Sequence, residues 1–173
     1  MTWRGATTTQ ERILACLPFL VPLLNAYPFG LLSSLLIRFP PLRWLFYPIE
    51  LLFPIYRIGG GGLSIVPLLV FIGLYVGVVR NNRIRHLIRY NAMQAIMLGI
   101  SLSLILTVFD LLGILSSAVV TAGAGTGLFL MAFFAVLFLG TVGIVAYSVI
   151  QSLRGHHAEV PWISDAAYAQ TRD

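Results

Sequence analysis

The chain has 173 residues, of which 58% are hydrophobic and only 10% are charged, and its mean hydropathy is +0.91. A soluble domain carries about 25% charged residues, so this composition excludes a soluble protein and predicts an all-α integral membrane protein. The eleven basic residues outnumber the six acidic ones. In a membrane chain basic residues flank the spans and set their orientation, so the excess does not indicate a nucleic-acid partner.

The chain begins with a short polar stretch, residues 1–12, and the first apolar run predicts a span over about residues 13–31. The opening lacks a long presequence rich in Arg and Ser, so we expect the first span itself to act as the membrane signal. Pro18, Pro22 and Asn25 predict a kinked helix that packs against its neighbours, because a proline frees a carbonyl that must find another donor in lipid. Cys16 is the single cysteine, and we expect it to be a buried structural thiol.

The stretch from Phe29 to Ile58 is apolar but repeatedly interrupted. The interruptions are four prolines and four charged residues: Pro40, Pro41, Pro48, Pro54, Arg38, Arg43, Glu50 and Arg57. No uninterrupted part reaches the ~20 residues that a span needs. We therefore predict interfacial amphipathic helices over about residues 32–58, between spans one and two, with Trp44, Tyr47 and Tyr56 at head-group depth. A re-entrant hairpin is the alternative.

Gly59 to Gly62 form a run of four glycines, which predicts a flexible joint. It is not a phosphate-binding loop, because no Lys-Ser/Thr pair follows it. Three further spans are predicted, over residues 63–79, 90–115 and 127–153, and a polar tail over residues 154–173. The fold predicted is therefore a single membrane domain of four transmembrane helices, residues 13–153.

The arginines predict the orientation of this domain. With four spans, both termini and the loop after span two lie on one side of the membrane. Eight of the eleven arginines then fall on that side, and the three on the other are Arg38, Arg43 and Arg57. By the positive-inside rule, both termini face the cytoplasm, or the stroma in a plastid membrane.

The third predicted span carries polar residues on two faces. At ~100° per residue, one face holds Asn91, Gln94 and Ser101. The nearly opposite face holds Gly99, Ser103, Thr107 and Asp110. Unsatisfied polar groups are costly in lipid, so both faces are expected to contact protein. Asn91 and Gln94 are either interhelical hydrogen-bond partners or the lining of a cytoplasmic vestibule. Asp110 is either an interface carboxylate or a functional intramembrane acid.

The fourth predicted span has small residues along one face, which predicts a helix-packing seam made of Ala132, Ala135, Gly143 and Ala146. His156 and His157 are adjacent and have no cysteine nearby, which favours a solvated tail over a metal site. We find no nucleophile–base pair, metal-ligand cluster or nucleotide loop in the sequence. The sequence therefore predicts no enzyme, no metal and no cofactor.

The run VRNNRIRHLIRYNAMQAIML, which starts at Val79, resembles the signature of the TIC-twenty family. This family is the small multi-span subunit of the translocon at the inner chloroplast envelope, with cyanobacterial homologues. The matching positions are Val79, Arg80, Asn81, His86, Ile88, Arg89, Tyr90, Asn91, Met93, Gln94, Ala95 and Ile96. The tail from Ala158 to Gln170 and the opening TWRG…ERI also resemble the family, whereas Leu87 and Tyr90 stand where Phe is expected.

The resemblance implies four helices with both termini on the stromal side and a role in a protein-conducting membrane complex. We expect a cyanobacterial-type homologue in the plasma or thylakoid membrane, or in the inner envelope if it is plastid-derived. Its expected partners are the lipid bilayer, other membrane subunits or further copies, and unfolded precursor proteins. The candidate functional cluster is Arg80, Asn81, Arg83, Arg85, His86, Arg89, Asn91 and Gln94. The alternative is a non-transporting assembly or scaffold factor for a larger photosynthetic or other membrane complex.

Overall fold

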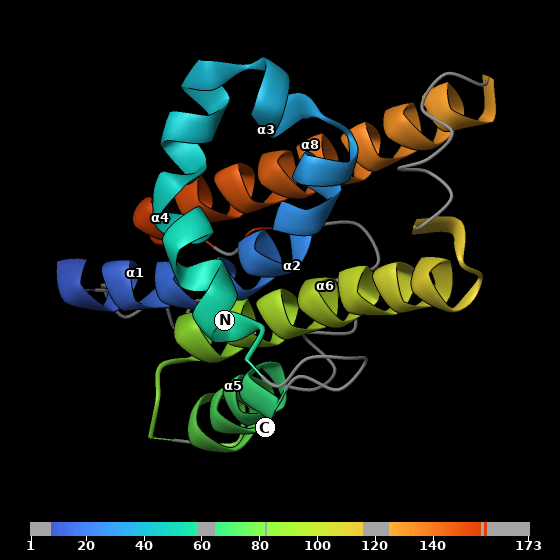
Figure 1. The fold of residues 1–173 in the computed structure, drawn as a ribbon. Helices are drawn as coiled ribbons and strands as arrows, with labels where there is room; N and C mark the ends of the chain where they lie inside the picture. Colours follow the sequence, from blue (N-terminus) through green and yellow to red (C-terminus); the bar gives the residue numbers. More distant parts are fainter. Residues whose placement is uncertain (1–7, 59–64, 82, 116–124, 157, 159–173) are drawn as a thin grey trace.

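A computed structural model describes residues 8–58, 65–81, 83–115, 125–156 and 158. Every regular element in these residues is helical (Figure 1). The elements are α1 (Thr9–Cys16), η1 (Leu17–Phe19), α2 (Leu20–Leu32), α3 (Leu35–Arg38), α4 (Pro40–Tyr56), α5 (Ile65–Leu74), η2 (Tyr75–Val79), α6 (His86–Leu111) and α8 (Gly125–Leu153).

The first membrane helix is a single unit made of α1, η1 and α2, and it runs from Thr9 to Leu32. A capping box starts it: the Thr8 amide donates to Glu11 Oε2 at 2.9 Å, and the Glu11 amide donates to Thr8 Oγ1 at 3.3 Å. The helix tightens to a 3₁₀ turn at Leu17–Phe19, where Pro18 lacks the N–H that an α-helical bond requires. The helix begins four residues earlier than the span predicted from hydropathy.

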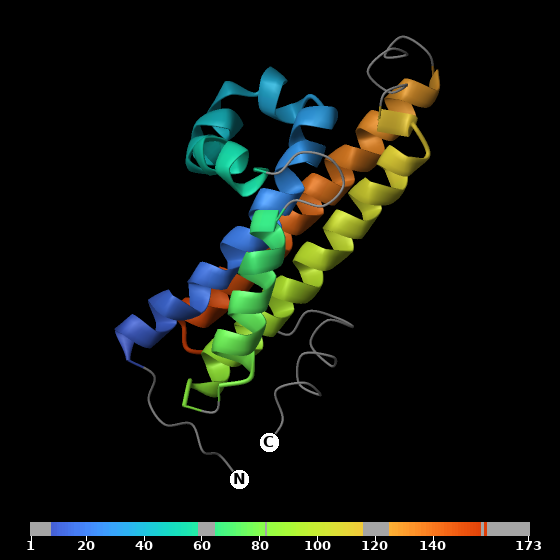
Figure 2. The same cartoon turned by 60° about the horizontal axis from the view of Figure 1, so that its bottom comes forward.

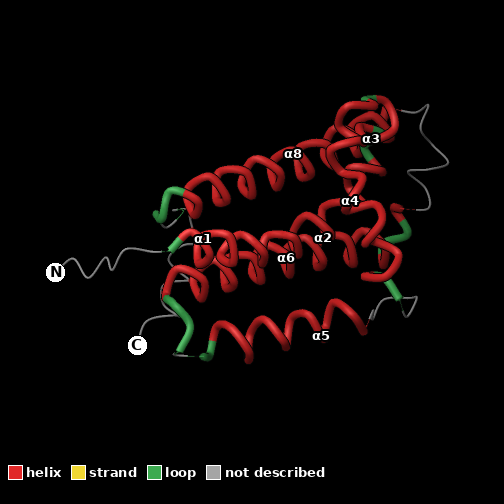
Figure 3. Tube along the Cα trace, turned by 90° about the vertical axis from the view of Figure 1, so that its left-hand side faces the viewer, coloured by secondary structure: helices red, strands yellow, loops and turns green. Residues whose placement is uncertain are grey.

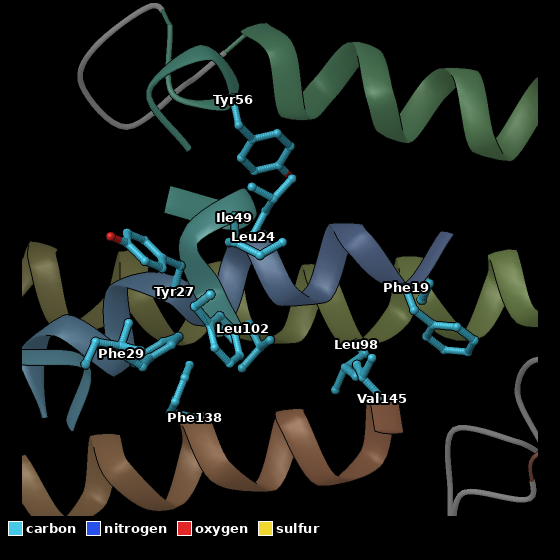
Figure 4. Packing of buried hydrophobic residues seen from close by; sticks show 14 of the residues in the cluster. Phe19, Leu24, Tyr27, Phe29, Ile49, Tyr56, Leu98, Leu102, Phe138 and Val145 are labelled. Atoms are coloured by element: carbon cyan, nitrogen blue, oxygen red, sulfur yellow. The ribbon is translucent and has the colours of Figure 1, made fainter. Parts of the chain in front are cut away.

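The centre of the fold is α2, which packs against both α6 and α8. The core between these helices holds large aromatic rings, including Phe134. Phe29 and Phe138 of the same core are shown in Figure 4. Gly30 allows the close approach of α2 to α8, because a Cβ atom at this position would lie 2.9 Å from Phe138 Cε2. A smaller cluster around Val79 joins η2 to α6.

Three helices are long and apolar enough to cross a membrane: Thr9–Leu32, His86–Leu111 and Gly127–Leu153. The apolar helix Ile65–Val79 is shorter, with 15 residues. At ~1.5 Å per residue it is about 22 Å long, below the ~30 Å of the hydrocarbon core. Its position as a further span therefore stays a prediction. The third span was predicted to end at residue 115, but α6 ends at Leu111 because Gly113 adopts a positive φ of 67°.

The interrupted stretch forms two helices after Leu32. After a turn in which Ser34 has a φ of 60°, α3 is only four residues long, but α4 continues for 17 residues through Pro48 and Pro54. In Figures 1 and 3, α4 runs across the long direction of α6 and α8 and does not extend α2. The stretch is not one straight helix, and its location in the membrane interface stays a prediction.

The two ends of the bundle carry different elements. The start of α1, the end of η2, the start of α6 and the end of α8 meet at one end (Figures 2 and 3). The helices α3 and α4, the start of α5 and the end of α6 lie at the other. We call these the basic end and the cap end, because the Arg80–Arg89 run lies at the first and α4 lies across the second.

Candidate functional site

The polar residues at the start of α6 are buried and hold three helices together. Asn91 and Gln94 are both 0% exposed. Asn91 Nδ2 donates to the Ala15 carbonyl oxygen of α1 at 2.9 Å and to Ser152 Oγ of α8 at 2.6 Å. Ser152 Oγ in turn donates to the Ser148 carbonyl oxygen at 2.7 Å. Asn91 therefore makes the interhelical hydrogen bonds of the first alternative, while a vestibule lining stays a prediction.

The same junction holds the chain that follows α8. The Tyr90 hydroxyl donates to the Ala158 carbonyl oxygen at 2.9 Å, and Gln94 Nε2 donates to the same oxygen at 3.3 Å. Ala158 is fully buried. Tyr90, Ser148 and Ser152 also belong to this site and were not among the candidates predicted from the sequence. Ser148 and Ser152 gave a signal that could have found them, because they lie one helical turn apart on the buried face of α8.

Three side-chain atoms in the junction have no hydrogen-bond partner among the described residues: Asn91 Oδ1, Gln94 Oε1 and Ser148 Oγ. All three are buried. A buried polar atom left unpaired costs about 1–3 kcal/mol, and such atoms are few in folded proteins. The junction is therefore a polar centre inside an otherwise apolar bundle.

The arginines of the candidate cluster divide into two kinds. Arg89 is only 6% exposed, and its Nε donates to the Val79 carbonyl oxygen at 2.9 Å, which ties α6 to the end of η2. Arg85 Nε lies 2.9 Å from Glu11 Oε1 in an ion pair with α1. These two hold the helices in place. Arg80 and Arg83 are exposed at the basic end.

Asn81 and His86 have local contacts within the same run. The Asn81 side-chain oxygen accepts a hydrogen bond from the Arg83 amide at 3.0 Å, and this shapes the turn. The His86 ring stacks on the Tyr90 ring with their centroids 6.3 Å apart. The structure therefore brings the residues of the candidate cluster to one end of the bundle, with Asn91 and Gln94 inside it and Arg80 and Arg83 outside.

Comparisons with known proteins show the family to which the chain belongs. A family model described as chloroplast import apparatus Tic20-like matches residues 8–167. The chain belongs to this family. A Tic20 family protein of Synechocystis sp. is 37% identical over 163 residues, which cover 94% of each chain. Protein TIC 20-II, chloroplastic, of Arabidopsis thaliana is 29% identical over 95% of this chain and 74% of its own length. Protein TIC 20-I, chloroplastic, of Arabidopsis thaliana is 30% identical over 92% of this chain and 53% of its own length.

The resemblance read from the signature run is thus confirmed, and the chain is a Tic20-like protein of the cyanobacterial type. In this Tic20-like fold the signature run forms the end of η2, the turn and the start of α6. Its residues Arg89, Tyr90, Asn91 and Gln94 hold the junction between the helices together. Family membership makes the chain a membrane protein related to an import translocon.

The second polar face of α6 lies toward the cap end of the Tic20-like bundle. Ser103, Thr107 and Asp110 line a cavity of about 710 Å³. Ser101, however, is exposed, and its hydroxyl donates to the Met97 carbonyl oxygen at 2.9 Å. Ser101 belongs to the first polar face, and the prediction that both faces contact protein is wrong at Ser101 and also at Thr107 and Asp110, which are exposed. The hydroxyls of Ser101 and Thr107 are satisfied within their own helix and need no neighbour.

The remaining candidates lie at the surface. Ala132, Gly143 and Ala146 are exposed and Ala135 is half-buried, so the small-residue seam of α8 faces away from the other described helices. Cys16 is half-buried and donates to the Arg12 carbonyl oxygen at 3.2 Å. His156 is exposed, and His157 lies outside the described residues. Among the residues described, no group of three His, Cys, Asp or Glu side chains is placed to hold a metal ion.

Proposed function

We propose that this Tic20-like chain is a subunit of a protein-conducting or precursor-handling complex in the cyanobacterial plasma or thylakoid membrane. Its basic end would face the cytoplasm. The observation that carries the proposal is the arrangement of the signature run. Its buried members fix α1, α6 and α8 to one another through Asn91, and its exposed members, Arg80 and Arg83, lie at the same end.

The interior of the bundle supports a subunit role over a channel within one copy. Tyr90, Phe19, Phe29, Phe134 and Phe138 are among the largest fully buried side chains. In the part of the chain that the structure describes, these side chains fill the core between the helices, which argues against a passage as wide as a polypeptide there. A conducting path would therefore lie between several copies or between this chain and other membrane subunits.

The basic end supplies groups that suit a passing chain or an acidic partner subunit. Arg85 and Arg89 are engaged by Glu11 and by the Val79 carbonyl oxygen. Arg80 and Arg83 extend outward from the junction, and their exposed position lets them contact another molecule. Long cationic side chains at a membrane surface interact most strongly with acidic groups.

The test removes these two charges and keeps the helices intact. Arg80→Gln with Arg83→Gln should fail to complement a deletion strain while the membrane topology is unchanged. Six arginines still remain on the near side against three on the other. The matched control is Arg4→Gln with Arg154→Gln, which removes the same charge from the same predicted side and should complement. Full activity of the Arg80/Arg83 variant would leave the run as an anchor only.

A non-transporting scaffold role is the second candidate, and the surface of α8 favours it. Its small-residue seam is exposed, and small residues allow another membrane helix to approach closely. Purification in mild detergent separates the two functions. A translocation subunit should copurify with unfolded precursors or other translocon subunits, whereas a scaffold should copurify with one stable membrane complex.

A further inference from the structure

A cavity at the cap end has two chemically different walls. It has a volume of about 710 Å³ and lies between α2, α4, α5 and α6. Its apolar wall comes chiefly from α2, through Leu24, Leu31 and Leu32. Its polar wall comes from α6, where Ser103, Thr107 and Asp110 recur at helical spacing. Arg57, directly after α4, and Asn25 of α2 complete the polar lining.

The depth of the cavity matches one zone of a bilayer. At ~1.5 Å per residue, Ser103 lies about 25 Å along α6 from His86, and Asp110 lies about 36 Å from it. The hydrocarbon core is ~30 Å thick. With the start of α6 at the near surface, Ser103 is just inside the far boundary of the core and Asp110 is beyond it. The cavity therefore spans the depth at which lipids of the far leaflet have their ester groups and head groups.

The polar atoms of the cavity are set in place but only partly paired. Asn25 Oδ1 accepts hydrogen bonds from the Tyr56 hydroxyl at 3.4 Å and from Ser103 Oγ at 3.2 Å. These two donors fix the orientation of the amide, and Figure 4 shows Tyr56 lying on the α2 side of α4 above Leu24. Among the described residues Asn25 Nδ2 has no acceptor. Thr107 Oγ1 donates to the Ser103 carbonyl oxygen at 2.8 Å, which leaves its lone pairs free to accept.

The charges of the cavity have opposite signs. The Arg57 guanidinium lies 5.9 Å from the centroid of the Phe53 ring. The Asp110 carboxylate is exposed at the end of α6 and has no ion-pair partner among the described residues. An anionic head group would be attracted by Arg57 and repelled by Asp110. A head group with no net charge but with both donors and acceptors suits the two together.

We infer that this cavity binds one diacylglycerol lipid of the far leaflet whose head group has no net charge. The head group lies between Arg57 and Asp110, an ester carbonyl accepts from Asn25 Nδ2, and an acyl chain lies along Leu24 and Leu31. Sugar hydroxyls and a zwitterionic phosphoethanolamine share the required chemistry. A polypeptide path is less well matched, because the buried junction around Asn91 closes the bundle at the other end of α6. The inference does not depend on the proposed transport function.

The test measures lipid retention on the full chain. The protein is purified in mild detergent and offered equal amounts of monogalactosyldiacylglycerol, phosphatidylethanolamine and phosphatidylglycerol with matched acyl chains, and the adducts are counted by native mass spectrometry. One molecule of a lipid without net head-group charge should be retained in preference to phosphatidylglycerol. The ratio between the first two lipids shows whether the sugar or the zwitterion is preferred. Equal retention of all three, or a preference for phosphatidylglycerol, would overturn the inference.

Two variants locate the site. Asp110→Leu with Thr107→Val should lower retention of the preferred lipid roughly fivefold or more, the effect of losing about one net hydrogen bond. Both residues are exposed, so folding should survive, and an unchanged gel-filtration profile checks this. Ser101→Leu is the control, because Ser101 is exposed on α6 but does not line the cavity. Unchanged retention in the double variant, or photocrosslinking from position 107 to a polypeptide instead of a lipid, would contradict the assignment.

Discussion

Asn91 shows how one side chain determines the arrangement of three helices. In an apolar bundle, packing alone favours many rotations and translations of a helix almost equally. A buried amide that must reach the Ala15 carbonyl oxygen and Ser152 Oγ at once is satisfied by a single arrangement. This arrangement also positions Arg85, because its ion pair with Glu11 requires α1 and α6 to lie side by side.

The first prediction at this scale concerns that amide. Asn91→Leu keeps the volume of the side chain and removes both interhelical hydrogen bonds. Helix association should weaken by about 1–2 kcal/mol, and the midpoint of thermal unfolding in detergent should fall. Ser101→Leu is the matched control, since it makes the same kind of change on an exposed face of α6. A fall no larger than that of the control would show that the junction does not stabilise the bundle.

The sequence allowed part of this site to be predicted. Asn91 and Gln94 were identified because two amides at the start of an apolar run demand partners in lipid. Their partners could not be identified, because Ser152 is 61 positions further along the chain and serines occur on several faces of the apolar helices. The sequence also could not show which arginines contact other helices and which face away from them. Nothing in the spacing of Arg83, Arg85 and Arg89 distinguishes an exposed side chain from one that donates to a backbone carbonyl.

At the scale of elements, α4 is notable because it contains two interior prolines. Pro48 and Pro54 cannot donate to the carbonyls of Trp44 and Glu50. The helix nevertheless continues, and Phe46, Ile49 and Tyr56 pack inward while Arg43 and Glu50 form an ion pair at 2.8 Å. Each of the two interior prolines removes one backbone hydrogen bond from α4, but the burial of the apolar face stabilises the helix along its whole length. In α4 the packing of the buried face outweighs the low helix propensity of the prolines.

The second prediction concerns the orientation of α4 in the membrane. Trp44 and Leu51 are both exposed and lie seven residues apart on one face of α4. Nitroxide labels at these positions should report similar membrane depths by oxygen accessibility if α4 lies along the far interface. Labels at Phe129 and Val136 of α8 have the same spacing and exposure. They should differ by about 10 Å in depth. An equal gradient along α4 would show that this helix crosses the membrane.

At the scale of the whole molecule, the arrangement of the ends agrees with the arginine count. The start of α1, the turn before α6 and the end of α8 meet at one end of the bundle (Figure 3). This was predictable, because it follows from alternating spans and from the positive-inside rule without any knowledge of contacts. The filled interior was not predictable, since an amphipathic helix facing a water-filled path and one facing protein have similar patterns. The number of spans depends on the short helix Ile65–Val79, which only a measurement of sidedness can decide.

The third prediction concerns the number of membrane spans. In a Cys16→Ser background, single cysteines at Gln10, Arg83 and His156 probe the basic end, and one at Leu112 probes the cap end; all four positions are exposed. A membrane-impermeant maleimide applied to intact spheroplasts should label Leu112→Cys alone, if the chain resides in the plasma membrane. The other three should react only after permeabilisation. The orientation should survive each change, because Arg83→Cys still leaves seven arginines against three. Labelling of Arg83→Cys with Gln10→Cys protected would place the two positions on opposite sides of the membrane. That result would contradict the four spans, and also the junction between Asn91 and Ala15, because this junction holds the starts of α1 and α6 at one end.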